Sequence, residues 1–230
     1  MTTRRTPAYS EKLDAALRLA AAAHYEDMRK GSQIPYVMHP FHVGLILDRY
    51  GFDEDLVIAG ILHDVLEDPE FEARSIQDRL RAVCPELTSA AGGGAFRDAV
   101  VDYIRQRFGE TVLALVEHVT EQKTDGNGED RPWKVRKDEQ LAALDGVSRD
   151  VAALKAADCL HNLHAMTRDV RENGTDSLFR FKGGPDGAWW YYSNVVRLVS
   201  PVLGNGHPLV TELEEALSEF TGTLTSAGVL

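Results

Sequence analysis

Residues 56–68 read LVIAGILHDVLED, an apolar run that ends in a cluster of one histidine and three acids. Asp53 precedes the run and has the short acceptor side chain typical of a helix N-cap. The pattern therefore predicts one helix that carries both the apolar run and the polar end. At helical spacing, one face of that helix would present Leu56, Gly60, His63 and Glu67.

The polar end of this stretch indicates a metal site. A face that changes from aliphatic to His63, Asp64 and Glu67 is costly to bury unless the charges are paired or bind a cation. Neutral imidazole and carboxylate groups suit manganese, iron or zinc. A solvated acidic helix end is the simpler alternative, but further ligand-type residues elsewhere in the chain argue against it.

The composition limits what the protein binds. The chain has 230 residues, of which 43% are hydrophobic, enough for a sizeable core. Its formal charge of −11 argues against duplex nucleic acid and anionic membranes as partners. Two cysteines, Cys84 and Cys159, are too few for a disulfide framework. No segment has the apolar run of a signal peptide or a membrane span, so we expect a cytoplasmic protein.

Every element that can be assigned from hydrophobic periodicity is helical, and no segment alternates like a β-strand. Ser10 and Ser148 are predicted helix N-caps. We expect a flexible N-terminus at residues 1–9, one domain over residues 10–205, and a last amphipathic helix within residues 206–230 that packs on it.

Residues 72–97 interrupt this pattern. Their first part is charged and weakly helical, and the segment AGGGA at 91–95 is a flexible break. Because candidate site residues lie on both sides, we expect an insertion or a mobile flap and not a domain boundary.

The first of two basic segments lies at Arg29, Lys30 and Ser32. Two adjacent cations in a turn with glycine and serine offer hydrogen-bond donors to a phosphate. A solvated turn explains the same residues equally well.

The second basic segment, residues 131–137, is the densest in an acidic chain and includes Lys134, Arg136 and Lys137. It would suit the rim of a site for a polyanionic ligand. It would equally suit the solvated face of a helix.

Three separated pieces carry ligand-type side chains: His39, the pair His63-Asp64, and Asp158. Asp158 interrupts the apolar stripe of a helix, where a carboxylate without a partner would be costly. Two imidazoles and two carboxylates make a four-ligand site that leaves positions open for water. Asn162, one helical turn after Asp158, can hydrogen-bond a carboxylate, a water or a substrate.

Together these pieces resemble the motifs of the HD-domain metal-dependent phosphohydrolases, and among them the hydrolase domain of the RelA/SpoT-type alarmone enzymes, including their small single-domain relatives. The matching segments are RKGSQIPYVMHP at 29–40, AGILHDVLED at 59–68 and LKAADCLHNL at 154–163. Shorter likenesses lie at 119–121 and 133–137, so the resemblance spans residues of about 13 to 200.

The resemblance implies an all-α HD-domain bundle in a single domain with one Mn²⁺, or else iron or zinc. The implied ligands are His39, His63, Asp64 and Asp158. Glu67 and Asp68 would orient and deprotonate the attacking water.

The implied reaction removes pyrophosphate from the 3′ position of ppGpp or pppGpp and gives GDP or GTP. The nucleotide would lie near Arg29, Lys30 and Ser32, with Asn162 at the ribose or phosphates. The segment that contains Lys134, Arg136 and Lys137 would line the side where a charged nucleotide enters.

The chain departs from the family pattern at two positions. Cys159 and His164 stand where basic residues are common, which predicts fewer fixed positive charges near the site. Only some 30 residues follow residue 200, so we expect a chain that degrades an alarmone and does not make one.

Two other functions remain open from the sequence. One is an HD phosphohydrolase that acts on another nucleotide, such as ppApp, NADPH or a nucleoside phosphate. The other is a non-catalytic module that binds a nucleotide or neutralises a protein partner. A homo-oligomer is compatible with each of these functions.

Overall fold

The computed structural model describes residues 9–67, 70–89 and 94–230. These ranges contain helices and two isolated β-bridges but no strand, which confirms the all-α prediction. The α-helices are α1 (Glu11–Ala23), α2 (Met38–Arg49), α3 (Glu54–Leu62), α4 (Arg74–Val83), α5 (Gly94–Phe108), α6 (Glu110–Val119), α7 (Trp133–Ala142), α8 (Arg149–Asn173), α9 (Gly184–Leu203) and α10 (Pro208–Ser226). Short 3₁₀ segments are η1 (Glu70–Glu72), η2 (Pro85–Ser89) and η3 (Thr175–Arg180).

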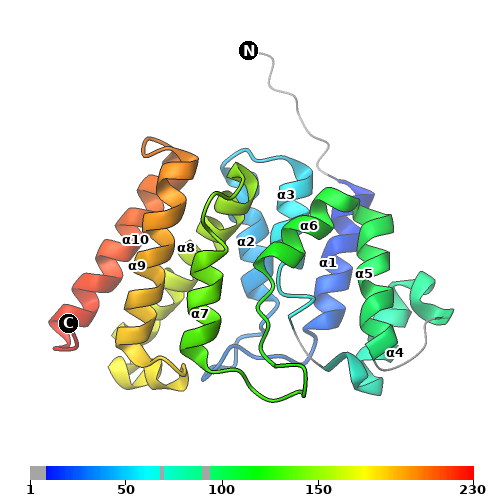
Figure 1. The fold of residues 1–230 in the computed structure, drawn as a ribbon, viewed down its shortest axis with the longest axis horizontal. Helices are drawn as coiled ribbons and strands as arrows, with labels where there is room; N and C mark the ends of the chain where they lie inside the picture. Colours follow the sequence, from blue (N-terminus) through cyan, green and yellow to red (C-terminus); the bar gives the residue numbers. More distant parts are fainter. Residues whose placement is uncertain (1–8, 68–69, 90–93) are drawn as a thin grey trace, which may run out of the picture.

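Helix α3 lies at the centre of the fold. Residues 56–62 are all buried, as expected for a helix that is hydrophobic on every face. Helices α1, α2, α6 and α8 all contact it (Figure 1). Asp53 caps its N-terminus, because Oδ1 accepts a hydrogen bond from the Leu56 N–H at 2.9 Å. This central helix delivers the polar residues that follow it to the middle of the molecule.

Helix α3 ends at Leu62, earlier than the periodicity predicted. The next residues form tight turns in which the Glu67 N–H donates to the Asp64 carbonyl at 3.0 Å. The ring Nδ1 of His63 lies 2.8 Å from the Gly60 carbonyl, the group that would accept from Asp64 if the helix continued. The prediction that one helix carries the whole stretch is therefore wrong, because a side chain takes the place of the next backbone bond.

Two glycines let α2 and α3 pack closely. A Cβ atom added at Gly60 would lie 2.7 Å from Leu47 Cδ1 and 3.3 Å from the backbone nitrogen of Gly44. One added at Gly44 would lie 2.6 Å from Ile61 Cγ1. The small residues therefore bring the middle of α2 close to the end of α3.

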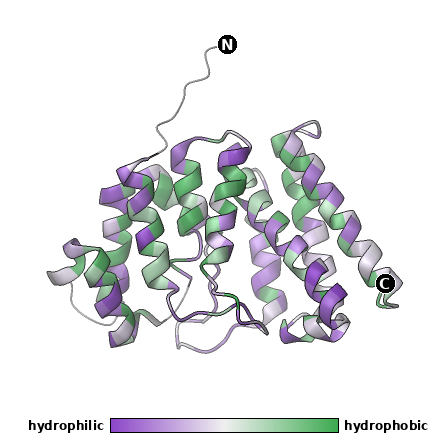
Figure 2. Ribbon diagram, turned by 180° about the vertical axis from the view of Figure 1, so that it is seen from behind, coloured by the Kyte–Doolittle hydropathy of each residue, from purple (hydrophilic) through white to green (hydrophobic). Residues whose placement is uncertain are grey.

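Helix α8 connects the central helices to the C-terminal ones. Ser148 caps it through a bond from the Val151 N–H, and it contacts α2, α3, α6, α9 and α10. Helix α10 packs on α8 and α9 and buries Leu213 and Phe220 (Figure 1). The helices in Figure 2 carry both hydrophobic and hydrophilic residues, as amphipathic helices of a packed bundle do.

The described part of residues 72–97 is folded against the rest of the domain. Ile76 and Leu80 of α4 are buried, and α4 contacts α1. That this segment is an insertion or a mobile flap stays a prediction. Residues 1–8, 68–69 and 90–93 lie outside the described ranges, and with them the proposed catalytic Asp68. None of the helices described is long and apolar enough to cross a membrane.

Candidate metal centre and substrate cavity

Four predicted ligands from three elements meet at one point. His39 lies in the first turn of α2, His63 and Asp64 follow α3, and Asp158 lies in α8. Ligand atoms of His39, His63 and Asp158 all lie within 4.8 Å of one another. Asp64 Oδ2 lies 3.2 Å from His63 Nε2 and 3.6 Å from His39 Nε2. Residues up to 119 positions apart in the sequence therefore form one cluster.

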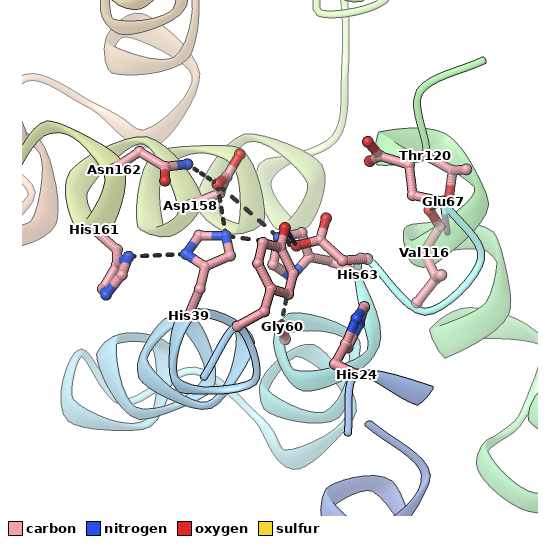
Figure 3. Close-up of polar contacts among 12 residues, drawn as sticks. His24, His39, Gly60, His63, Glu67, Val116, Thr120, Asp158, His161 and Asn162 are labelled. Carbon is pink, nitrogen blue, oxygen red and sulfur yellow. Dashed lines mark hydrogen bonds and ion pairs between the residues drawn. The ribbon is translucent and has the colours of Figure 1, made fainter. Parts of the chain in front are cut away.

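His39 and His63 both direct Nε2 toward the carboxylates of the cluster. Nδ1 of His63 is engaged by the Gly60 carbonyl, and Nδ1 of His39 lies 2.8 Å from Nδ1 of His161. Figure 3 shows His39 between His161 and Asp158. The Nε2 atoms are thus the ones that face the centre of the cluster.

The charges in the cluster favour a bound cation. Burial alone would raise the pKa of Asp158, but Lys155 at 2.8 Å and the two imidazoles hold it well below its usual value. Burial likewise opposes ionisation of Asp64, whose pKa is nevertheless lowered by His63 and His39. Burial lowers the pKa of His39, which keeps its ring neutral and able to act as a ligand. Two buried carboxylates face one lysine and leave a net negative charge, which favours a bound cation, and the imidazole and carboxylate donors suit a divalent metal ion.

Hydrogen bonds hold both carboxylates in place. The Tyr36 hydroxyl donates to Asp64 Oδ2 at 2.6 Å, and its own pKa is raised well above the usual value by burial and by Asp64. The Asn162 amide donates to Asp158 Oδ1 at 2.6 Å and accepts from Arg29 at 3.0 Å. Asn162, expected to contact a substrate, therefore has both ends of its amide engaged within the protein.

Glu67 lies beside the cluster and contributes no atom to it. Its Oε1 is 3.3 Å from Lys123 Nζ, and 17% of its side chain is exposed. Burial raises the pKa of Glu67 and Asp64 adds to the rise, while Lys123 opposes it. A carboxylate with a raised pKa next to a cavity can accept a proton from water.

The cluster opens into a cavity of about 570 Å³. The lysines and arginines that line it are Arg29, Lys30, Lys123, Arg136, Lys137, Lys155, Arg180 and Lys182. The carboxylates that line it are Asp27, Asp64, Glu67, Glu121, Asp130 and Asp158. Among the described residues, eight cations against six anions give the lining of this cavity a basic excess, although the whole chain carries −11. In a chain that is acidic overall, this basic excess would favour a small anionic ligand at the cavity.

The predicted substrate contacts divide into two groups. Arg29, Lys30, Arg136 and Lys137 line the cavity, as just described. Ser32 and Lys134 do not, because local contacts hold them elsewhere. The Ser32 hydroxyl bonds to the Arg29 carbonyl at 3.1 Å, and Lys134 pairs with Asp138 over the face of Trp190.

The two departures from the family pattern also lie outside the cavity. Cys159 is fully buried in the hydrophobic core, and His164 is half-exposed, 3.9 Å from Glu219 of α10. Successive residues of α8 point in different directions, so the neighbours of Asp158 do not face the cavity with it. That the two changes reduce the positive charge near the site stays a prediction.

Sequence reasoning missed several residues of the site. Lys155 and His161 lie three positions before and after Asp158, a spacing that places them on the same side of a helix and could have identified them. Lys123, Arg180 and Lys182 lie in loops or short segments, where no periodicity points to the cavity.

The family follows from comparison with known proteins. A model of the HD domain matches residues 16–178, so the chain belongs to the HD-domain family, as its motifs predicted.

Two relatives have names that refer to one activity. A guanosine-3′,5′-bis(diphosphate) 3′-pyrophosphohydrolase of Aquifex aeolicus is 32% identical over 114 residues, which cover 50% of this chain and 12% of that protein. The mouse guanosine-3′,5′-bis(diphosphate) 3′-pyrophosphohydrolase MESH1 is 29% identical over 162 residues, which cover 69% of this chain and 71% of that protein. The chain thus spans a small part of the first relative and most of the second.

A solved structure supports the fold. It is described as a metazoan ortholog of SpoT that hydrolyzes ppGpp. It superposes with a TM-score of 0.62 at 24% identity and covers 98% of this chain and all of that one. The two chains therefore share the architecture of the whole domain.

Proposed function

We propose that this protein is a Mn²⁺-dependent phosphohydrolase that removes pyrophosphate from the 3′ position of ppGpp or pppGpp. The observation that carries the proposal is the position of the His-Asp cluster in the wall of a locally basic cavity. The names of the Aquifex and mouse relatives support this substrate class.

The metal would be held by His39, His63, Asp64 and Asp158. Neutral imidazole with carboxylate suits manganese, iron and zinc, and manganese is the ion that the family resemblance favours. A divalent ion bound there would lower the pKa of water and neutralise charge on the phosphoryl oxygens.

The residues of the chain would supply proton transfer and binding. Glu67 takes a proton from the attacking water, and Asp68 assists it. A buried and therefore raised pKa suits Glu67 to accept a proton near neutral pH. Arg29 binds a phosphate, because its Nη1 is buried without a hydrogen-bond partner among the described residues and its side chain lines the cavity.

The basic lining of the cavity favours substrates that carry several negative charges. Lys30 and Lys137 line the same cavity as Arg29, so a nucleotide with several phosphates gains more from the basic wall than a monophosphate does. The walls also include Trp133 and Tyr191, aromatic side chains against which a base can pack.

The proposal is tested with a panel of ppGpp, pppGpp, ppApp, NADPH and a nucleoside monophosphate, assayed with Mn²⁺ and with EDTA. Pyrophosphate and phosphate release are measured separately. We expect Mn²⁺-dependent pyrophosphate release from the guanosine tetra- and pentaphosphates. Faster turnover of ppApp or NADPH would replace the substrate assignment and leave the phosphohydrolase class intact.

Binding without turnover would identify the non-catalytic alternative. Glu67→Gln separates the two cases, since the variant keeps the shape of the side chain and removes the base. For an enzyme, turnover should fall by a factor on the order of 10² or more, while Mn²⁺ binding is retained. For a binding module, ligand affinity would be measurable and neither protein would turn over.

A further inference from the structure

The two ring nitrogens of His39 have different surroundings. Nε2 lies 3.3 Å from Asp158 Oδ1 and 3.6 Å from Asp64 Oδ2, at the centre of the cluster. Nδ1 points the other way and lies 2.8 Å from Nδ1 of His161 (Figure 3). A metal in the cluster can therefore be reached by Nε2 and not by Nδ1.

Two ring nitrogens 2.8 Å apart share one hydrogen, so one ring donates and the other accepts. If His39 gives the lone pair of Nε2 to a metal, its single ring hydrogen lies on Nδ1. His161 must then accept on a bare Nδ1 and carry its own hydrogen on Nε2. The short contact thus couples the tautomer of His161 to that of His39.

His161 is held in the orientation that this requires. It lies on α8 one turn after Asp158, and its ring contacts the imidazoles of His39 and His42 on α2. The ring centroids are 4.8 Å from His39 and 4.9 Å from His42. These ring contacts and the short approach of the two Nδ1 atoms favour the orientation in which Nδ1 of His161 is directed at His39.

The two histidines of the cluster are oriented by different means. His63 Nδ1 bonds to the Gly60 carbonyl, a backbone acceptor that no substitution removes. His39 depends on a side chain, which a substitution can remove. Partners of this kind commonly alter metal affinity 10- to 100-fold.

We propose that His161 is a positioning residue that holds His39 in the Nδ1–H tautomer and so presents Nε2 to the metal. The inference rests on the proposed metal site. It assigns to His161 neither contact with the substrate nor a direct bond to the metal.

The test compares the Mn²⁺ affinity of three variants. The affinity is measured by titration, with free Mn²⁺ detected by electron paramagnetic resonance. His161→Asn keeps an acceptor, because Asn Oδ1 is attached to Cγ as His Nδ1 is. His161→Phe keeps a ring and removes the acceptor. His42→Phe keeps the ring beside His161 and leaves the bond to His39 intact, so it is the matched control.

We expect the dissociation constant for Mn²⁺ to rise about 10- to 100-fold in His161→Phe and by less than about threefold in His161→Asn and His42→Phe. Affinity unchanged in His161→Phe, or lost equally in His161→Asn, would overturn the role of the acceptor. Melting temperatures in EDTA show whether each variant folds.

A measurement on the unaltered protein decides the matter even if a variant does not fold. Loaded with diamagnetic Zn²⁺, its ¹⁵N–¹H spectrum should place the ring hydrogen of His39 on Nδ1 and that of His161 on Nε2. The opposite tautomers would overturn the inference while leaving a metal site in place. Failure of the unaltered chain to bind either ion would instead remove the metal site itself, and the inference with it.

Discussion

The guanidinium of Arg136 lies 2.9 Å from the carboxylate of Glu121, and only 10% and 8% of these side chains are exposed. Arg136 therefore does not offer a free charge to a nucleotide, although it borders the cavity. Lys137 also contacts Glu121, at 3.3 Å, and its pKa is lowered by burial. The basic segment predicted as the rim of the site is thus in part a structural ion-pair network.

Replacing Arg136 with Met should destabilise the protein. Loss of one partner of a buried ion pair leaves an uncompensated charge. We expect the free energy of unfolding, measured by urea denaturation, to fall by about 3 kcal/mol. This value is at the low end of the usual cost of breaking a buried ion pair, because Lys137 still contacts Glu121. The double variant Arg136→Met/Glu121→Leu should recover most of the loss. Lys134→Met, on an exposed pair, is the control and should change stability by less than about 1 kcal/mol.

Gly60→Ala should weaken both the fold and the metal site. The added Cβ would press against the Gly44 backbone at 3.3 Å and against Leu47, so α2 must move away from α3. Overpacking of this kind costs about 1–3 kcal/mol, and the shift separates His39 from His63. Unfolding free energy and Mn²⁺ affinity should fall together.

Gly222→Ala is the control for that substitution. Gly222 lies in α10 with no atom within 4 Å of an added Cβ, and replacing glycine in a helix should stabilise by a few tenths to about 1 kcal/mol. Equal behaviour of the two variants would show that the close approach of α2 and α3 is not required.

Removal of one proposed ligand should abolish the response to metal. A ligand that binds only the native state stabilises it by mass action, by about 2.7 kcal/mol at 100 times its dissociation constant. Added Mn²⁺ should therefore raise the melting temperature of the unaltered protein and not that of His63→Ala. His118→Ala, at an exposed position on α6, should respond like the unaltered protein. A full response in His63→Ala would exclude that residue from the ligand set.

The pH dependence of turnover should report Glu67. A general base must be ionised, so kcat at saturating Mn²⁺ should fall as the pH decreases through the raised pKa of Glu67. Lys123 lowers that pKa, so Lys123→Met should move the acidic limb of the profile to higher pH. A limb that stays in place, or moves to lower pH, would show that another group controls it.

The sequence by itself determined the helical class and the candidate ligands of this protein. Hydrophobic periodicity and N-caps such as Ser10, Asp53 and Ser148 depend on local spacing, and the structure has the predicted capping bonds. His63, Asp64 and Asp158 were identifiable because costly polar side chains end or interrupt apolar runs, and His39 because its segment resembles a family motif.

Only the tertiary structure decided which charges are available and how the ligands are oriented. Arg136 and Glu121 pair across a loop, Lys123 reaches Glu67, and His161 meets His39 from 122 positions away. These contacts join different elements, so no periodicity within one element predicts them. The packing of elements that are distant in the sequence sets them, because it brings polar groups into largely buried positions where each must find a partner in the protein.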